Sequence, residues 1–165
     1  MNELPNRKII RLKNHDYSSA GYYFITICTK DKQNPLGKIV GDAHQGVPYM
    51  ELNEMGNIVH QHIESINSAY DNVKVDKFVV MPNHIHLILI VEGGTPECAS
   101  PTKSVVAKVV NAFKSLTSRR VGGSMWQRAY HDRIIRNEKE YMKIWNYIDG
   151  NPAIWADDCY YINSI

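Results

Sequence analysis

Hydrophobic and polar side chains alternate along several segments of the chain, and this alternation predicts strands. The first segment, YYFITICT, is rich in aromatic and β-branched residues, which favour a pleated, half-buried surface. Six segments fit the pattern: residues 22–29, 36–40, 49–52, 73–81, 84–91 and a short stretch within 126–136. The dipeptide Pro82-Asn83 lies between the fourth and fifth segments and predicts a tight connection between them.

Three other segments repeat apolar residues every three or four positions, as amphipathic helices do. They cover residues 53–70, 100–120 and 137–150. The expected caps are Asn53 for the first helix, Ser100 with Pro101 for the second, and Asn137 with Glu140 as a capping-box partner for the third, which Pro152 ends. In the second helix the expected inward residues are Val105, Val106, Val109, Val110, Phe113 and Leu116.

The resulting order, β-β-β-α-β-β-α-β-α, has no regular βα repeat. We therefore expect an α+β fold in which helices pack on one face of a mainly antiparallel sheet. The chain has 165 residues, of which 44% are hydrophobic and 22% charged, and this suits one globular domain spanning residues 1–165.

The sequence predicts a cytoplasmic protein with no membrane partner. No apolar stretch approaches the roughly 20 residues of a membrane span, and the first residues lack the apolar core of a signal peptide. Cys28, Cys98 and Cys159 are widely spaced and form no CxxC pair, so they indicate neither a disulfide framework nor a zinc ribbon.

Positive charge is concentrated in the C-terminal half. Residues 101–143 hold ten basic and three acidic side chains, although the formal charge of the whole chain is only +2. Such a surplus predicts a polyanion as partner, with phosphate contacts that weaken as salt rises. The alternative is a solvated basic helix face, which charge alone would favour.

The segment His84-Ile85-His86 carries the main chemical signal. Side chains alternate along a strand, so both imidazoles point to one face about 7 Å apart, where they could share a divalent metal. Ile85, Leu87, Leu89 and Val91 should then face the core. The alternative is a pair of histidines on a solvated or partly buried sheet face. By contrast, His60 and His62 fall on a helix, where two residues turn about 200° and the side chains diverge.

The last helix offers further ligands. Tyr141, Ile144, Trp145 and Ile148 form the stripe expected to pack on the sheet. Tyr147 and Asn151 are four residues apart at one edge of that stripe, so a phenol and an amide oxygen could reach one spot. The alternative is that Tyr147 packs in the core and Asn151 only ends the helix.

Three motifs in this order resemble a known family. They are Met81-Pro82-Asn83-His84-Ile85-His86, Trp126-Gln127-Arg128 and Tyr147-Ile148-x-x-Asn151-Pro152, preceded by Arg11-Leu12-Lys13, Asp16-Tyr17-Ser18 and Tyr23-Phe24-Ile25-Thr26. From about Arg7 to Trp155 the chain resembles the HUH single-tyrosine transposases, and within them the REP-associated tyrosine transposases.

The resemblance implies a ferredoxin-like, RRM-type sandwich and a site with defined roles. His84, His86 and Asn151 would bind a divalent metal, Mg²⁺ or Mn²⁺, and Tyr147 would be the nucleophile. In the autonomous insertion-sequence enzymes the third ligand is usually glutamine, so Asn151 favours the REP-associated branch. The implied activity is metal-assisted transesterification on single-stranded or hairpin DNA through a 5′-phosphotyrosine, by a monomer or a homodimer associated with the nucleoid.

Other interpretations stay open at this point. Tyr141 and Tyr130 are rival nucleophiles, although neither is followed four residues later by a ligand-type side chain. The chain could instead be a non-catalytic RRM-like nucleic-acid-binding protein, or a metal-dependent hydrolase that uses water. Candidate DNA contacts are Lys114, Arg119, Arg120, Arg128, Arg133 and Arg136 for phosphates, and Trp126, Tyr17 and Tyr130 for stacking on bases.

Overall fold

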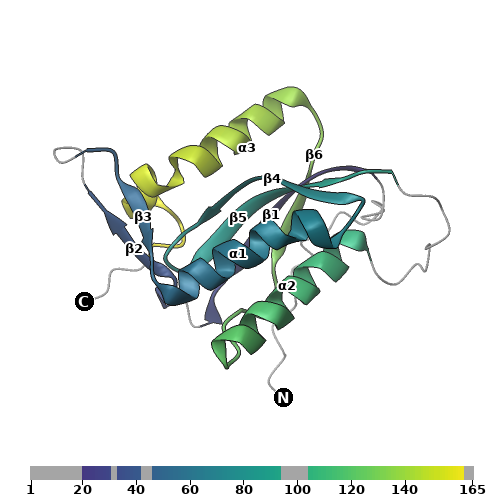
Figure 1. The fold of residues 1–165 in the computed structure, drawn as a ribbon. Helices are drawn as coiled ribbons and strands as arrows, with labels where there is room; N and C mark the ends of the chain where they lie inside the picture. The colour runs from purple at the N-terminus through teal and green to yellow at the C-terminus, as the bar shows by residue number, and fades with distance from the viewer. Residues whose placement is uncertain (1–19, 31–32, 42–45, 94–103, 162–165) are drawn as a thin grey trace, which may run out of the picture.

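A computed structural model describes residues 20–30, 33–41, 46–93 and 104–161 (Figure 1). Its centre is an antiparallel sheet with the strand order β4-β5-β1-β6. These strands are β1 (Gly21–Cys28), β4 (Val73–Val80), β5 (His84–Val91) and β6 (His131–Ile135). The remaining two, β2 (Gly37–Val40) and β3 (Tyr49–Leu52), form a separate two-stranded hairpin. The antiparallel α+β fold that the pattern predicts is confirmed.

Helices cover both faces of the sheet (Figure 1). The first two, α1 (Glu54–Ala69) and α2 (Val105–Val121), lie side by side on one face, as expected. The third, α3 (Glu138–Gly150), crosses the opposite face, so the expectation of one helical layer is wrong for this helix. The physical reason is that this face carries buried Ile88 and Ile135, which need a cover. No helix in the described ranges is long and apolar enough to cross a membrane.

The main core lies between the sheet and the pair α1 and α2. It takes every second residue of the two central strands, including Tyr23 and Ile25 of β1, and Ile85, Leu87 and Leu89 of β5, none more than 3% exposed. The predicted inward face of β5 is thus confirmed. The other residues of these strands therefore point toward α3.

A second, smaller core holds α3 against the sheet. Ile144 and Ile148 are buried against Ile88 and Ile135, and Tyr141 and Trp145 pack at the border. The predicted stripe of the last helix is therefore confirmed. Because the helix is fixed along its length, the residues near its C-terminal end lie at a defined place above β5 and β1.

Two of the predicted helix caps are confirmed. Asn53 accepts a hydrogen bond from the Gly56 amide, and Asn137 accepts one from the Glu140 amide, both at 2.9 Å. The capping-box partner is wrong, because the Glu140 carboxylate accepts from the Arg136 amide and not from the amide of the cap.

The start of the second helix also differs from the prediction. Ser104 caps α2 by accepting from the Ala107 amide, whereas Ser100 and Pro101 lie outside the described residues. Leu116, expected inside, is 47% exposed, and Thr117 is buried in its place. Thr117 follows Phe113 by four residues, so it continues the inward stripe one turn further along.

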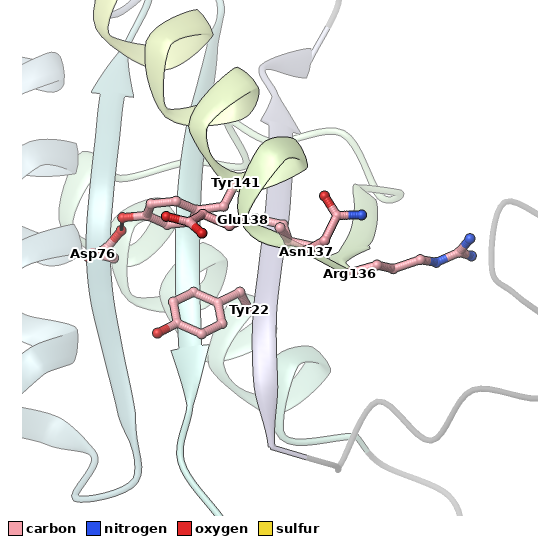
Figure 2. A pocket seen from close by; sticks show the side chains of 7 residues that line it. Tyr22, Asp76, Arg136, Asn137, Glu138 and Tyr141 are labelled. Atoms are coloured by element: carbon pink, nitrogen blue, oxygen red, sulfur yellow. Dashed lines mark hydrogen bonds between the residues drawn. The ribbon is translucent and has the colours of Figure 1, made fainter.

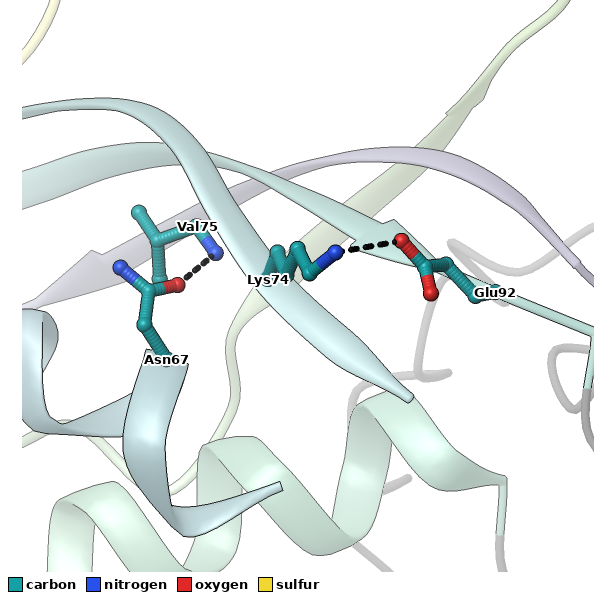
Figure 3. Close-up of polar contacts among 4 residues, drawn as sticks. All are labelled: Asn67, Lys74, Val75 and Glu92. Atoms are coloured by element: carbon teal, nitrogen blue, oxygen red, sulfur yellow. Dashed lines mark hydrogen bonds and ion pairs between the residues drawn. The ribbon is translucent and has the colours of Figure 1, made fainter. Parts of the chain in front are cut away.

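The outer strand β4 carries an irregularity that matters below. Its pairing with β5 shifts between Val75 and Lys77, so that Asp76 has no partner in the ladder. Just before this bulge, Asn67 of α1 accepts a hydrogen bond from the Val75 amide at 2.7 Å, and Lys74 pairs with Glu92 at 2.8 Å (Figure 3). These contacts fix the strand on the N-terminal side of Asp76.

Candidate active site

Strand β5 begins with the two histidines of the predicted site. The rings of His84 and His86 lie side by side, with centroids 4.4 Å apart, on the face of the sheet that α3 covers. They are 0% and 2% exposed, so both imidazoles are removed from solvent. The prediction that the two imidazole rings share one face of the strand is therefore confirmed.

Neighbouring side chains fix the orientation of each ring. His84 Nδ1 lies 2.9 Å from Asn83 Oδ1, and His86 Nδ1 lies 2.8 Å from Thr26 Oγ1. Since an amide oxygen only accepts, the proton of His84 sits on Nδ1 and leaves a lone pair on Nε2. That Nε2 atom is buried and has no hydrogen-bond partner within the described part of the chain.

Burial keeps both imidazoles uncharged. It lowers the pKa of His84 to about 4, although the nearby Asp158 carboxylate acts in the opposite direction. Burial, together with neighbouring His84, also lowers the pKa of His86 well below its ordinary value. Neutral imidazole is the form that binds metal ions, because the cation has no lone pair to donate.

The end of α3 brings two more polar groups to the histidines. The hydroxyl of Tyr147 lies 3.2 Å from His86 Nε2. Asn151 begins the short 3₁₀ helix η3 (Asn151–Asp157) and is 0% exposed, and its Oδ1 atom is buried without a partner among the described residues. The structure therefore brings together all four residues predicted for the site.

Asp158 is a fifth member that sequence reasoning missed. Its Oδ2 atom accepts hydrogen bonds from the Tyr147 hydroxyl at 3.0 Å and from Asn151 Nδ2 at 3.1 Å. Ligand atoms of His84, His86 and Asp158 all lie within 4.8 Å of one another. No local spacing marks this residue, because η3 turns the chain back before Asp158 reaches the site.

These donors suit a divalent metal. Among the residues that the structure describes, His84 Nε2 and Asn151 Oδ1 are buried acceptors without a partner, and an ion bound by both would satisfy them. Asp158 adds a carboxylate within reach of both imidazoles. A mixed set of imidazole nitrogen with amide and carboxylate oxygen fits Mn²⁺ well and allows Mg²⁺.

The phenol of Tyr147 is protonated at neutral pH. Burial, and then the negative charge of Asp158, raise its pKa above the ordinary value. The hydroxyl therefore donates to Asp158 in this structure, and the two acceptors within reach of its proton are Asp158 Oδ2 and His86 Nε2. Phe24 packs edge-on against the ring, with centroids 6.3 Å apart, and helps hold it in place.

The segment after α3 covers the site. The ring of Tyr160 lies 4.5 Å from that of His84 and 5.9 Å from that of His86, and Trp155 lies 5.9 Å from His84. The backbone oxygen of Tyr160 accepts from Asn83 Nδ2 at 2.8 Å, so the cover is hydrogen-bonded to the connection before β5. Burial raises the pKa of Tyr160 to about 12.

The rival tyrosines lie elsewhere. Tyr141 donates to Asp76 Oδ2 at 2.6 Å, and this hydrogen bond raises its pKa to about 12. It stands six residues before Tyr147, which is about 9 Å along the helix. Tyr130 packs beneath the ammonium of Lys114, 5.2 Å from its ring centroid.

Two of the residues predicted to contact DNA make contacts within the fold. Lys114 donates to the backbone oxygens of Gln127, Arg128 and Ala129, and burial lowers its pKa to about 8. Trp126 is 6% exposed, and its indole donates to Thr117 at 2.8 Å. Both residues therefore hold the loop before β6 against α2.

The predicted arginines are exposed but do not form one cluster. Arg119 and Arg120 end α2, on the far side of the sheet from the histidines. Arg128 precedes β6, Arg133 lies within this strand, and Arg136 lies between it and the start of α3. Arg133 also pairs with Glu140. The last three are thus the arginines nearest to the elements that carry the site.

Comparison with known proteins agrees with this picture. The family model described as "Transposase IS200 like" matches residues 17–151. An uncharacterized protein of Haemophilus influenzae is 38% identical over 178 residues, which cover 97% of this chain and 96% of that protein. A solved structure of a REP-associated tyrosine transposase bound to a REP hairpin has a TM-score of 0.61 at 19% identity, over 92% of this chain and 73% of that one. The last likeness confirms the predicted fold.

Proposed function

Because the chain belongs to the family of IS200-like transposases, we propose that it cleaves and rejoins single-stranded DNA through Tyr147. One observation carries the proposal. A phenol, two neutral imidazoles and an amide oxygen meet at one buried place, and two of their acceptor atoms have no partner within the described residues. Core packing alone does not account for this arrangement, since unsatisfied buried acceptors destabilise a fold.

In this proposal His84, His86 and Asn151 hold a divalent cation, Mg²⁺ or Mn²⁺, with Asp158 as an additional ligand or a hydrogen-bond partner. When bound, the ion polarises an oxygen of the scissile phosphate and offsets the charge that develops there. Asn83 and Thr26 fix the imidazoles through their Nδ1 atoms, so that each Nε2 atom is presented to the centre.

Tyr147 supplies the nucleophile. Its hydroxyl gives up a proton to Asp158 Oδ2, and the phenolate oxygen attacks the phosphorus. The bond from phosphorus to the 3′ oxygen breaks, that oxygen leaves as a 3′-hydroxyl, and a 5′-phosphotyrosine remains. Attack by a 3′-hydroxyl on this linkage reverses the step, so rejoining requires no nucleotide cofactor.

The proposed substrate is single-stranded or hairpin DNA. The solved relative with the same fold is described as bound to a REP hairpin, and the present chain has its surplus of positive charge in residues 101–143. Arg128, Arg133 and Arg136 are the proposed phosphate contacts, because they lie in or directly beside β6, the strand that leads into α3.

Denaturing gel electrophoresis tests the proposal. We expect end-labelled hairpin DNA with single-stranded flanks to give, in Mn²⁺, a protein adduct that survives denaturant. Tyr147→Phe should abolish the adduct, whereas the matched control Tyr141→Phe should keep it. Cleavage without an adduct would favour the water-dependent hydrolase, and binding without cleavage would favour the RRM-like binding protein.

A further inference from the structure

A second site lies on the same face of the sheet, near the start of α3. We propose that this pocket binds an unpaired base of the DNA strand, with a preference for guanine, while Tyr147 acts on a nearby phosphate. The inference rests on the proposed function. It assigns a base-recognition role to Tyr22 and Asp76, which the catalytic proposal does not use.

The pocket has a volume of about 470 Å³ and an aromatic and acidic lining. Figure 2 shows the rings of Tyr22 and Tyr141 close together, with Asp76 and Glu138 beside them and Arg136 extending away toward the other side. The two rings meet edge to face, with centroids 5.6 Å apart. Tyr22 is 43% exposed, so its ring is available to a ligand.

The backbone places Asp76 at this pocket. It is the residue that the bulge in β4 leaves outside the ladder, and bulges of this kind redirect a side chain. Its Oδ2 atom accepts from Tyr141 at 2.6 Å, which ties the strand to α3. A carboxylate has about four lone-pair sites, so Asp76 keeps acceptor capacity for a ligand.

The chemistry of the lining selects a base over a phosphate. Asp76 and Glu138 repel an anion, whereas they accept hydrogen bonds from the ring N–H and amino groups of a base. The exposed ring of Tyr22 offers a surface for stacking, which every base can use. Arg136, at the rim, is placed to contact the backbone that carries the base.

The pocket and the catalytic residues belong to one row of side chains. Tyr22, Phe24 and Thr26 are alternate residues of β1 and share a face. Thr26 binds His86, Phe24 stacks on His86 at 5.2 Å, and Tyr22 contacts Tyr141. The ends of this row, Tyr22 and Thr26, are four residues apart in the sequence, which is about 13 Å along the strand. A strand that reaches Tyr147 can therefore place a neighbouring base in the pocket.

Guanine fits best because of its donor pattern. It presents a ring N–H and an amino group side by side, and a carboxylate can accept both. Adenine and cytosine offer one amino group, and thymine offers only a ring N–H. A good bidentate contact discriminates by at least about fivefold.

The test measures binding without catalysis. Fluorescence anisotropy in EDTA would compare labelled dT12 with the same strand carrying one central dG, dA, dC or deoxyinosine, which lacks the amino group. We expect dG to bind at least about fivefold more tightly than thymine at that position, and deoxyinosine to lose part of the gain. Asp76→Asn should remove the preference, and the control Asp71→Asn, an exposed aspartate before β4, should keep it.

Stacking is tested separately. Tyr22→Leu should weaken binding of all strands about fivefold or more, whereas Tyr49→Leu, an exposed tyrosine of the β2–β3 hairpin, should not. Thermal melting of each variant would verify that it is folded.

Three results would overturn the inference. The first is that strands with a central dG and strands with only dT bind equally well. The second is that the preference for dG persists in Asp76→Asn. The third is that Asp76→Asn weakens binding of a basic octalysine peptide but leaves DNA binding unchanged, which would show that the pocket binds cationic peptides. Adduct formation in Mn²⁺ is a separate readout. If the adduct forms without base preference, only this inference fails, and if the preference exists without an adduct, only the proposed function fails.

Discussion

Metal binding should stabilise the protein, and the stabilisation should depend on the histidines of β5. The structure contains two buried acceptors without partners in its described part, His84 Nε2 and Asn151 Oδ1. An unsatisfied buried acceptor destabilises the fold by about 1–3 kcal/mol, so an ion that satisfies both acceptors can stabilise the folded state by several kcal/mol. At a metal concentration 100 times Kd, preferential binding to the folded state raises the free energy of unfolding by about 2.7 kcal/mol. For a chain of this length that corresponds to a rise in Tm of roughly 5–10 °C.

Differential scanning fluorimetry with and without Mn²⁺ measures this rise. We expect it in the wild type and expect His84→Ala or Asn151→Ala to lose most of it. The matched control is His62→Ala, because His60 and His62 repeat the same His-x-His spacing on α1, outside the site. The comparison uses the shift within each variant, since removing His84 also leaves Asn83 with one partner fewer. An equal shift in the His84 and His62 variants would refute the metal site.

Three further predictions follow from single features of the structure. As the pH falls from about 6.5 to 4, the free energy of unfolding of the metal-free protein should decrease by on the order of 3 kcal/mol. The reason is that the folded state holds His84 at a pKa of about 4, so the unfolded chain binds the proton more readily. Urea titrations across this pH range measure the decrease. Lys114→Met should lower the free energy of unfolding by about 1–3 kcal/mol without changing the salt dependence of DNA binding, whereas Arg136→Ala should reduce that salt slope by about one. Asp158→Asn should slow adduct formation at saturating Mn²⁺ without abolishing DNA binding, and equal rates in the two proteins would show that the carboxylate has no part in the reaction.

The sequence predicts best what depends on neighbours along the chain. The strands, the inward face of β5 and the stripe of α3 follow from periods of two and of about 3.6 residues, and all three are confirmed. The convergence of the histidines with Tyr147 was implied by the family resemblance and not by the local pattern. It required α3 to pack on the face of the sheet that carries the histidines.

Features that depend on distant contacts were not predictable. Asp158 reaches the histidines only after the kinked 3₁₀ helix η3, and no local sequence spacing predicts that it lies beside them. Lys114 and Trp126 stand in a basic segment that suggests DNA contacts, and local spacing does not reveal that both also hold the loop before β6 against α2. The placement of α3 on the second face depends on how much apolar surface the finished sheet leaves uncovered.

The aromatic cover over the imidazoles makes access a step of its own. While Tyr160 lies on His84 and its backbone oxygen accepts a hydrogen bond from Asn83, the two imidazoles are almost fully buried, so a phosphodiester must displace this cover to reach their nitrogens. Apparent affinity for DNA is then the intrinsic affinity multiplied by the fraction of molecules in which the segment has swung aside. Each 1.4 kcal/mol that favours the shut form lowers that affinity about tenfold. Under the proposed function, such a cover would keep the protein idle among chance single strands and would let it respond to strands that bind strongly enough to displace Tyr160.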